Sequence, residues 1–222
     1  GRELIVTLEK PFEPGGFYTV IAGGLKDRSP AGNATPGRGF EFLAKPGVMQ
    51  RGEFIERWAL LGPLPRDVNN HPFDVAAVRP SPGDELKLAD GKSLKWQQVN
   101  RQALDLDEMF GGGAGVDDKM VYASVYVFSD RARDAFLRTD TNDHNRAWLN
   151  GRLVQDDITG ATGSRGWHDR ADETPVKLVK GWNQLLIQVE NQKSSWGLVA
   201  QLTDGRGRVI RDLTYQTAAP MK

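Results

Sequence analysis

Short runs rich in Val, Leu, Tyr, Phe and Trp recur along the chain and are separated by turns rich in glycine and proline. Three such runs, Leu4–Leu8, Phe17–Ala22 and Gly39–Ala44, occupy the N-terminal part. Runs of this composition bounded by turn residues are typical of strands, and in the third run Phe40 and Phe42 stand at alternate positions. We therefore predict three strands here, with Phe40 and Phe42 on one face of the third.

A second and longer series of strand patterns begins near Phe54. Met120–Ser129 is its longest run and the richest in β-branched and aromatic residues, so we place it at the centre of a sheet. Asn150-Gly151 predicts a tight hairpin turn. Residues 65–90 are expected to be rich in loops, and Asp130–Arg138 could form one helical turn at most. The strands expected in this series are residues 54–64, 94–99, 120–129, 135–139, 146–149, 176–179, 184–190 and 196–203.

The composition agrees with a turn-rich β-sandwich and limits the possible partners. The 222 residues include 25 glycines and 12 prolines, too many for a helical protein of this size. Basic and acidic side chains number 29 each, and no basic run of the kind that follows a phosphate backbone is present. Nucleic acid and anionic membrane are therefore not expected as partners. No apolar stretch approaches the roughly 20 residues that span a bilayer.

The absence of cysteine excludes disulfides, thiolate metal sites and cysteine nucleophiles together. The first residues, Gly1 to Leu4, lack the basic, apolar and small-residue order of a signal peptide and lead directly into a strand pattern. We therefore expect Gly1 to be a processing boundary, with further sequence upstream of it.

The N-terminal part carries a recurrent order of turn and aromatic residues. It consists of Tyr18-Thr19-Val20, Gly24, Lys26-Asp27, Ala31-Gly32-Asn33 and Phe40-Glu41-Phe42. This order resembles the C-terminal half of bacterial Ig-like domains, whose usual role is to space domains on exported proteins. The resemblance implies that residues 1–46 are a partial Ig-like β segment. Because such a sandwich needs about seven strands, we expect the remainder upstream or on another chain, and an isolated chain that tends to associate.

The larger part also carries a series of motifs in a fixed order. They are Trp58-Ala59-Leu60-Leu61-Gly62-Pro63, Tyr122-Ala123, Trp148-Leu149-Asn150-Gly151, Lys180-Gly181-Trp182-Asn183 and Trp196-Gly197. The series resembles galactose-binding-like jelly-roll modules of secreted bacterial proteins. It implies an all-β fold, with a jelly-roll β-sandwich at residues 47–222 preceded by the partial Ig-like segment. It also implies an extracellular or periplasmic location, within a protein that degrades polysaccharide or carries a haem or quinone cofactor.

A sugar site needs flat aromatic faces and nearby polar groups, so the six tryptophans are the first residues to sort. Trp58, Trp148 and Trp182 stand in strand or turn motifs and are expected in the core. Trp96 and Trp196 suit either core or surface. Trp167 lies in a glycine-rich loop, Gly160 to Arg170, without apolar periodicity. We expect it to be exposed and to bind ligand together with Arg165, His168, Asp169 and Arg170, although a loop tryptophan capping the sandwich explains the same pattern.

The turn from Asp140 to Asn145 departs from the shorter acidic turn usual before this Trp-Leu-Asn-Gly motif. Asp140, Asn142 and Asp143 offer oxygen ligands that suit a structural calcium ion. Hairpin turns are also rich in Asp and Asn because these side chains bond their own backbone, so no cofactor is assigned. Gly111 to Gly115 resembles a phosphate loop in composition but lacks the following lysine, and we expect a flexible loop there.

Three functions follow from these observations. The first is a non-catalytic accessory module of a larger exported protein that binds a polysaccharide or another glycan. The second is a docking or spacer domain of a redox or polysaccharide-degrading assembly. The third is a lyase or glycosidase, although the chain has no Gly-x-Ser-x-Gly motif and paired carboxylates cannot be recognised from spacing alone. An exposed aromatic beside a groove would favour binding, whereas a broad apolar patch would favour docking.

Overall fold

A computed structural model describes residues 17–22, 31, 38–43, 54–67, 70–141, 143–157, 172–193 and 196–221. The chain divides into two compact units, Gly1–Val48 and Met49–Lys222. In the first unit β1 (Phe17–Ala22) pairs antiparallel with β2 (Arg38–Leu43). Two of the three N-terminal strands predicted from the sequence are therefore confirmed, and the predicted strand Leu4–Leu8 lies outside the described residues.

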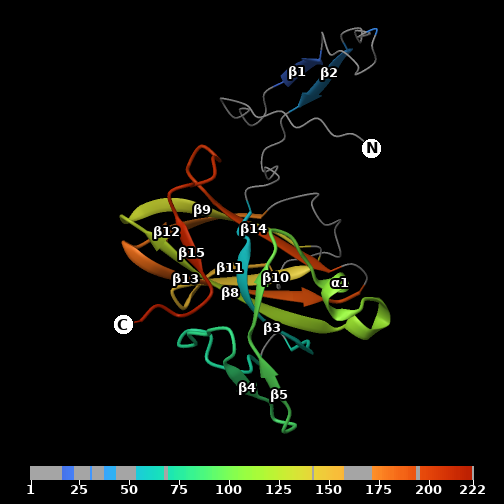
Figure 1. The fold of residues 1–222 in the computed structure, drawn as a ribbon, viewed down its shortest axis with the longest axis vertical. Coiled ribbons are helices and arrows are strands. Elements are labelled where there is room, and N and C mark those ends of the chain that lie inside the picture. Colours follow the sequence, from blue (N-terminus) through green and yellow to red (C-terminus); the bar gives the residue numbers. More distant parts are fainter. Residues whose placement is uncertain are drawn as a thin grey trace. The chain divides into compact units, whose positions relative to one another are not determined.

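The second unit is built from two antiparallel sheets (Figure 1). The larger has seven strands in the order β11-β10-β13-β8-β3-β6, with β15 also paired to β8. The predicted central position of residues 120–129 is confirmed, since β8 pairs with β13 along one side and with β3 and β15 along the other. The strands are β3 (Arg57–Pro65), β6 (Gln97–Asn100), β8 (Lys119–Ser129), β10 (His144–Leu149), β11 (Arg152–Asp156), β13 (Gly181–Asn191) and β15 (Thr214–Gln216).

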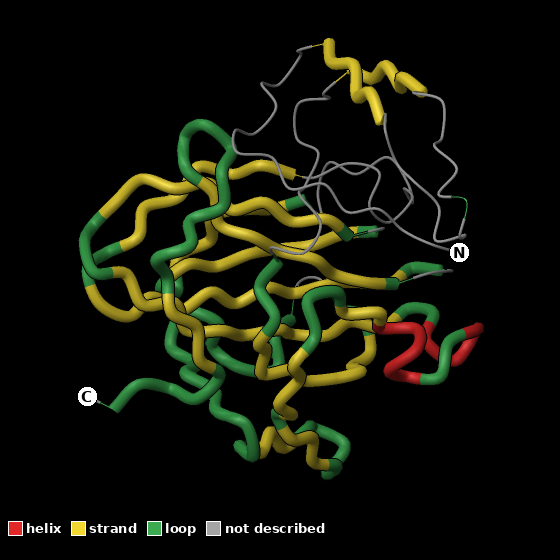
Figure 2. Tube along the Cα trace, turned by 45° about the horizontal axis from the view of Figure 1, so that its top comes forward, coloured by secondary structure: helices red, strands yellow, loops and turns green. Residues whose placement is uncertain are grey.

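The smaller sheet has four strands in the order β12-β9-β14-β7, and a separate two-stranded hairpin joins β4 to β5. Strands account for most of the described backbone in Figure 2, so the predicted all-β sandwich is confirmed. The elements are β4 (Glu85–Lys87), β5 (Ser93–Lys95), β7 (Leu104–Asp105), β9 (Arg133–Asp140), β12 (Asp172–Leu178) and β14 (Gly197–Thr203).

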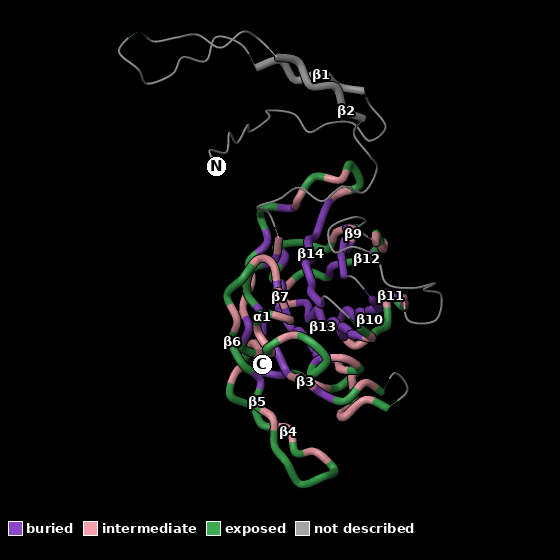
Figure 3. The backbone as a smooth tube through the Cα atoms, turned by 90° about the vertical axis from the view of Figure 1, so that its right-hand side faces the viewer, coloured by how far each residue is buried: buried purple, intermediate pink, exposed green. Residues whose placement is uncertain are grey.

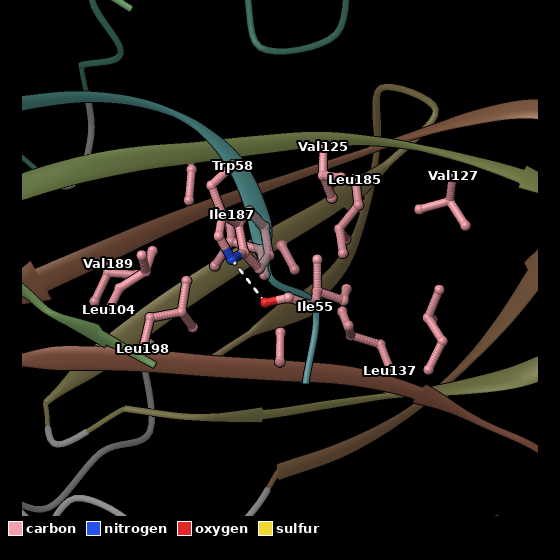
Figure 4. Close-up of a cluster of buried hydrophobic side chains, with 14 of the residues drawn as sticks. Ile55, Trp58, Leu104, Val125, Val127, Leu137, Leu185, Ile187, Val189 and Leu198 are labelled. Atoms are coloured by element: carbon pink, nitrogen blue, oxygen red, sulfur yellow. Dashed lines mark hydrogen bonds between the residues drawn. The ribbon is translucent and has the colours of Figure 1, made fainter. Parts of the chain in front are cut away.

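The main core lies between the two sheets, because alternate residues of each strand point inward (Figure 4). Val121, Val125 and Val127 of β8 face Leu137 of β9 across this layer. Trp58 is 1% exposed, and its indole Nε1 donates a hydrogen bond to the Ile55 carbonyl at 3.0 Å. Burying apolar area of this kind is the main favourable contribution to the stability of a sandwich.

The outer face of the larger sheet is covered by residues 70–96, which we call the covering segment. Tyr122 and Trp148 on the sheet form a second apolar cluster with Phe73 and Trp96 of the segment. The Tyr126 hydroxyl donates to the Pro80 carbonyl at 3.1 Å. Residues 65–90 were predicted to be rich in loops, and this is confirmed for the described residues of that range, which lie outside strands and helices apart from Pro65 at the end of β3 and the short strand β4. The outermost part of the segment, the β4–β5 hairpin, is partly exposed (Figure 3).

The helical elements differ from the prediction. Asp130–Arg138 forms no helical turn, because residues from Arg133 onward belong to β9. Helix instead occurs at α1 (Leu106–Phe110), where the Asp105 side chain caps the Glu108 amide, and in a 3₁₀ turn, Gly113–Val116. Gly111 ends α1 with a φ of 89°, which glycine adopts without strain. The loop expected at residues 111–115 is therefore largely a regular turn.

Candidate functional site

The binding residues predicted from the sequence cannot be placed. Trp167, Arg165, His168, Asp169 and Arg170 all lie outside the described residues. Their role in ligand binding therefore stays a prediction.

The predicted calcium ligands are placed in part. Asp140 and Asp143 are 2% and 3% exposed, whereas Asn142 lies outside the described residues. The Asp143 carboxylate accepts a hydrogen bond from the Gln192 amide at 2.7 Å, so it ties its turn to the end of β13. Among the described residues no group of three or more His, Asp or Glu side chains is arranged to hold a metal ion. The calcium site stays a prediction that the described geometry does not support.

The tryptophans divide differently from the prediction. Trp58 and Trp148 are buried as expected, and Trp96 and Trp196 are buried as well. The prediction of a core position is wrong for Trp182. This residue is only half-buried, since it lies near the start of β13, where its ring packs edge-on against the exposed ring of Phe128 at 5.3 Å.

The described surface has a polar groove on the outer face of the larger sheet, at the edge formed by β6. Val99 packs against the inner core, so the alternating residues Gln98 and Asn100 point to the opposite face. Arg57 pairs with Asn100 in the register of β3 and β6 and points to that face too. The groove has a volume of about 530 Å³, and we call it the edge groove. Its lining residues are Glu56, Arg57, Gln98, Asn100, Arg101 and Gln102.

The two arginines of the edge groove differ in how closely each is paired with a carboxylate. Arg101 donates a hydrogen bond to Glu108 at 2.9 Å, an exposed ion pair that holds the Arg101 guanidinium beside α1. Arg57 Nε lies 4.0 Å from the Glu56 carboxylate, and both side chains are more than half exposed. The carboxamides of Gln98 and Asn100 lie 3.4 Å apart from nitrogen to oxygen. The side chains that line the groove therefore offer both hydrogen-bond donors and hydrogen-bond acceptors at the edge of a regular sheet.

A second polar cluster lies deeper on the same sheet face. His71 of the covering segment places Nδ1 2.8 Å from the Tyr122 hydroxyl and packs edge-on against Trp148. Burial, with the nearby Arg146 guanidinium, lowers the pKa of His71, while burial raises the pKa of Tyr122. Arg66 donates to the fully buried Glu190 carboxylate at 2.7 Å. The contacts of His71 fasten the covering segment to the sheet, and Arg66 pairs with Glu190, so we assign these groups a structural role.

An apolar pocket of about 200 Å³ lies elsewhere on the second unit, at the start of its described chain. It is lined by Phe54, Ile55, Val209, Ile210, Arg211, Leu213 and Tyr215. Burial raises the pKa of the Tyr215 hydroxyl, in keeping with this apolar surround. The pocket has room for one apolar side chain.

No family model matches the chain, and no curated protein matches it. A β-glucosidase of Kluyveromyces marxianus shares 15% identity over 75% of this chain and 19% of that chain, with a TM-score of 0.41. A PA14 sugar-binding domain from an RTX adhesin shares 18% identity over 75% of this chain and 77% of that chain, with a TM-score of 0.36.

An anti-sigma factor domain-containing protein shares 10% identity over 84% of this chain and 58% of that chain, with a TM-score of 0.42. The chain therefore spans less than a fifth of the β-glucosidase and less than two thirds of the anti-sigma protein. At such identities and TM-scores these similarities give no basis for assigning a ligand. Among the described residues no helix has the length and apolar character needed to cross a membrane.

Proposed function

We propose that the chain is a non-catalytic accessory module of a larger exported bacterial protein, and that it binds carbohydrate in the edge groove. The observation that carries the proposal is the lining of this groove. It combines three carboxamides, two guanidiniums and one carboxylate. Two of the carboxamides, on Gln98 and Asn100, stand on one regular strand, which fixes their spacing.

This lining suits the hydroxyl groups of sugars. Each hydroxyl both donates and accepts hydrogen bonds, and a carboxamide does the same, whereas guanidinium only donates and carboxylate only accepts. A neutral hydrogen bond adds about 0.5–1.5 kcal/mol net, since it replaces a bond to water. Several contacts along one ligand are therefore needed, as an extended polysaccharide would provide.

The single carboxylate in the groove supports a binding role over hydrolysis there. A glycosidase needs two carboxyl groups on either side of the scissile bond. Of the six described residues that line the groove, only Glu56 carries one. A docking role remains the alternative, and the apolar pocket beside Phe54 and Leu213 is the observation that favours it.

The test is binding of the purified chain to a panel of plant, algal and microbial polysaccharides. The double variant Gln98→Ala/Asn100→Ala removes two exposed side chains from the groove and should weaken binding about 5- to 150-fold. Gln97→Ala is the matched control, since Gln97 is exposed on the same strand but does not line the groove. Trp167→Ala tests the site predicted from the sequence.

The outcomes separate the alternatives. Loss of binding in the double variant, with Gln97→Ala unaffected, supports carbohydrate binding in the edge groove. If Trp167→Ala abolishes binding while the double variant retains it, the ligand occupies the loop of Trp167 and the edge groove is the wrong site. Absence of binding to every polysaccharide contradicts a carbohydrate function and favours docking.

A further inference from the structure

The edge groove contains one arginine that its neighbours hold only weakly. Arg101 is engaged by Glu108 at 2.9 Å. Arg57 has a single ionic contact within the described part of the chain, at 4.0 Å from Glu56, and its side chain is 57% exposed. A distance of 4.0 Å is at the limit of an ion pair and too long for a hydrogen bond. The Arg57 guanidinium therefore remains available to a ligand.

The groove also offers no surface on which a sugar ring could stack. None of its six described lining residues is aromatic or aliphatic. Neutral sugars usually gain much of their affinity by placing the apolar side of the ring on an aromatic face. In this groove that contribution is absent, and hydrogen bonds between neutral groups must compete with water. A negatively charged ligand would gain more binding free energy, because its hydrogen bonds to a guanidinium are charge-assisted.

From these two observations we propose that the edge groove recognises a carboxylated sugar, that is, a uronate residue of an acidic polysaccharide. The Arg57 guanidinium pairs with the sugar carboxylate, for which its planar pair of N–H donors is suited. Gln98 and Asn100, on the same face of the sheet, bind hydroxyls of that residue or its neighbour. The proposal rests on the proposed function and narrows it to a substrate class.

Glu56 gives the proposal a distinctive test. Its carboxylate lines the same groove and lies beside Arg57. It repels an anionic ligand and partly neutralises Arg57, so Glu56→Gln should tighten binding of a uronate. For a neutral sugar Glu56 could act only as a hydroxyl acceptor or not at all, and the same change would weaken binding or leave it unaltered. The direction of the effect therefore reports the charge of the ligand.

The experiment measures binding of polygalacturonate, of its fully methyl-esterified form and of dextran sulfate by isothermal titration calorimetry. Each is tested against the wild type, Arg57→Gln, Arg57→Lys and Glu56→Gln, with Arg152→Gln as the matched control. Arg152 is an exposed arginine of β11 that does not line the groove. Loss of a charge-assisted pair corresponds to a weakening of about 10- to 100-fold.

We expect polygalacturonate to bind, more weakly at higher salt. Arg57→Gln should reduce its affinity about 10- to 100-fold, Arg57→Lys less, and Glu56→Gln should raise it, while Arg152→Gln has no effect. Equal affinity for the esterified polymer, or weaker binding in Glu56→Gln, would overturn the uronate proposal and leave carbohydrate binding intact. Equal affinity for dextran sulfate would also overturn it, because any anion would then suffice. No binding to these polymers or to the wider panel contradicts the proposed function itself.

Discussion

Gly151→Ala tests how the covering segment is fastened to the larger sheet. Gly151 lies in the turn between β10 and β11 with a φ of 79°, a conformation that costs an alanine about 1–2 kcal/mol. A Cβ at this position would also overlap the backbone carbonyl of Ala76 in the covering segment. A backbone atom cannot rotate away as a side chain can, so overpacking adds about 1–3 kcal/mol. The total loss of unfolding free energy is therefore about 2–5 kcal/mol.

Gly91→Ala is the matched control. Gly91 has a similar φ of 82°, but nothing lies within 4 Å of an added Cβ. It should lose only the conformational part, about 1–2 kcal/mol. Urea denaturation followed by tryptophan fluorescence measures both variants, and in a thermal scan each kcal/mol corresponds to about 2–4 °C. Equal losses in the two variants would refute the close packing of the β10–β11 turn against the covering segment.

Three further predictions concern buried titratable groups. Arg66→Gln should lower the unfolding free energy by about 3–5 kcal/mol in urea denaturation, because it leaves the fully buried Glu190 carboxylate without its ionic partner; an unchanged midpoint would refute this. Burial lowers the pKa of His71, so the unfolded chain binds the proton more readily; stability should fall as pH drops below about 6.5, and His71→Gln should reduce that slope in pH-dependent denaturation. Burial also raises the pKa of Tyr126 to about 12, so Tyr126 should remain protonated at about pH 11 in the folded protein. In a spectrophotometric titration, Tyr126→Phe should therefore leave the phenolate signal at about pH 11 unchanged, and a loss of that signal would contradict the prediction.

The sequence predicted the long central strand well because a strand buried on both faces is rich in β-branched and aromatic residues. Met120–Ser129 was recognised as a central strand, and β8 spans it with only one more residue at its start. Short elements escaped detection. Leu106–Phe110 is too short to show a helical period, and Thr214–Gln216 forms a strand only because β8 offers it an open edge. Trp182 was assigned to the core from its motif, but the motif does not show that its ring packs against the exposed ring of Phe128.

The edge groove could be predicted only in part. The alternation of Gln98, Val99 and Asn100 was visible and indicated one polar face. What joins these residues to Arg57 is the register between β3 and β6, which places Arg57 opposite Asn100 although the two residues are far apart in the chain. Register depends on how the whole sheet packs and cannot be taken from the spacing of either strand. The site that the sequence favoured, around Trp167, drew on loop composition, which indicates exposure but no partner.

The most direct test of carbohydrate binding in the edge groove compares the wild type, Gln98→Ala/Asn100→Ala and Gln97→Ala on one polysaccharide that the wild type binds. Circular dichroism first verifies that all three are folded. The proposed function predicts a loss of about 5- to 150-fold in affinity for the double variant and none for Gln97→Ala. Equal affinity in all three proteins would show that the edge groove does not hold the ligand.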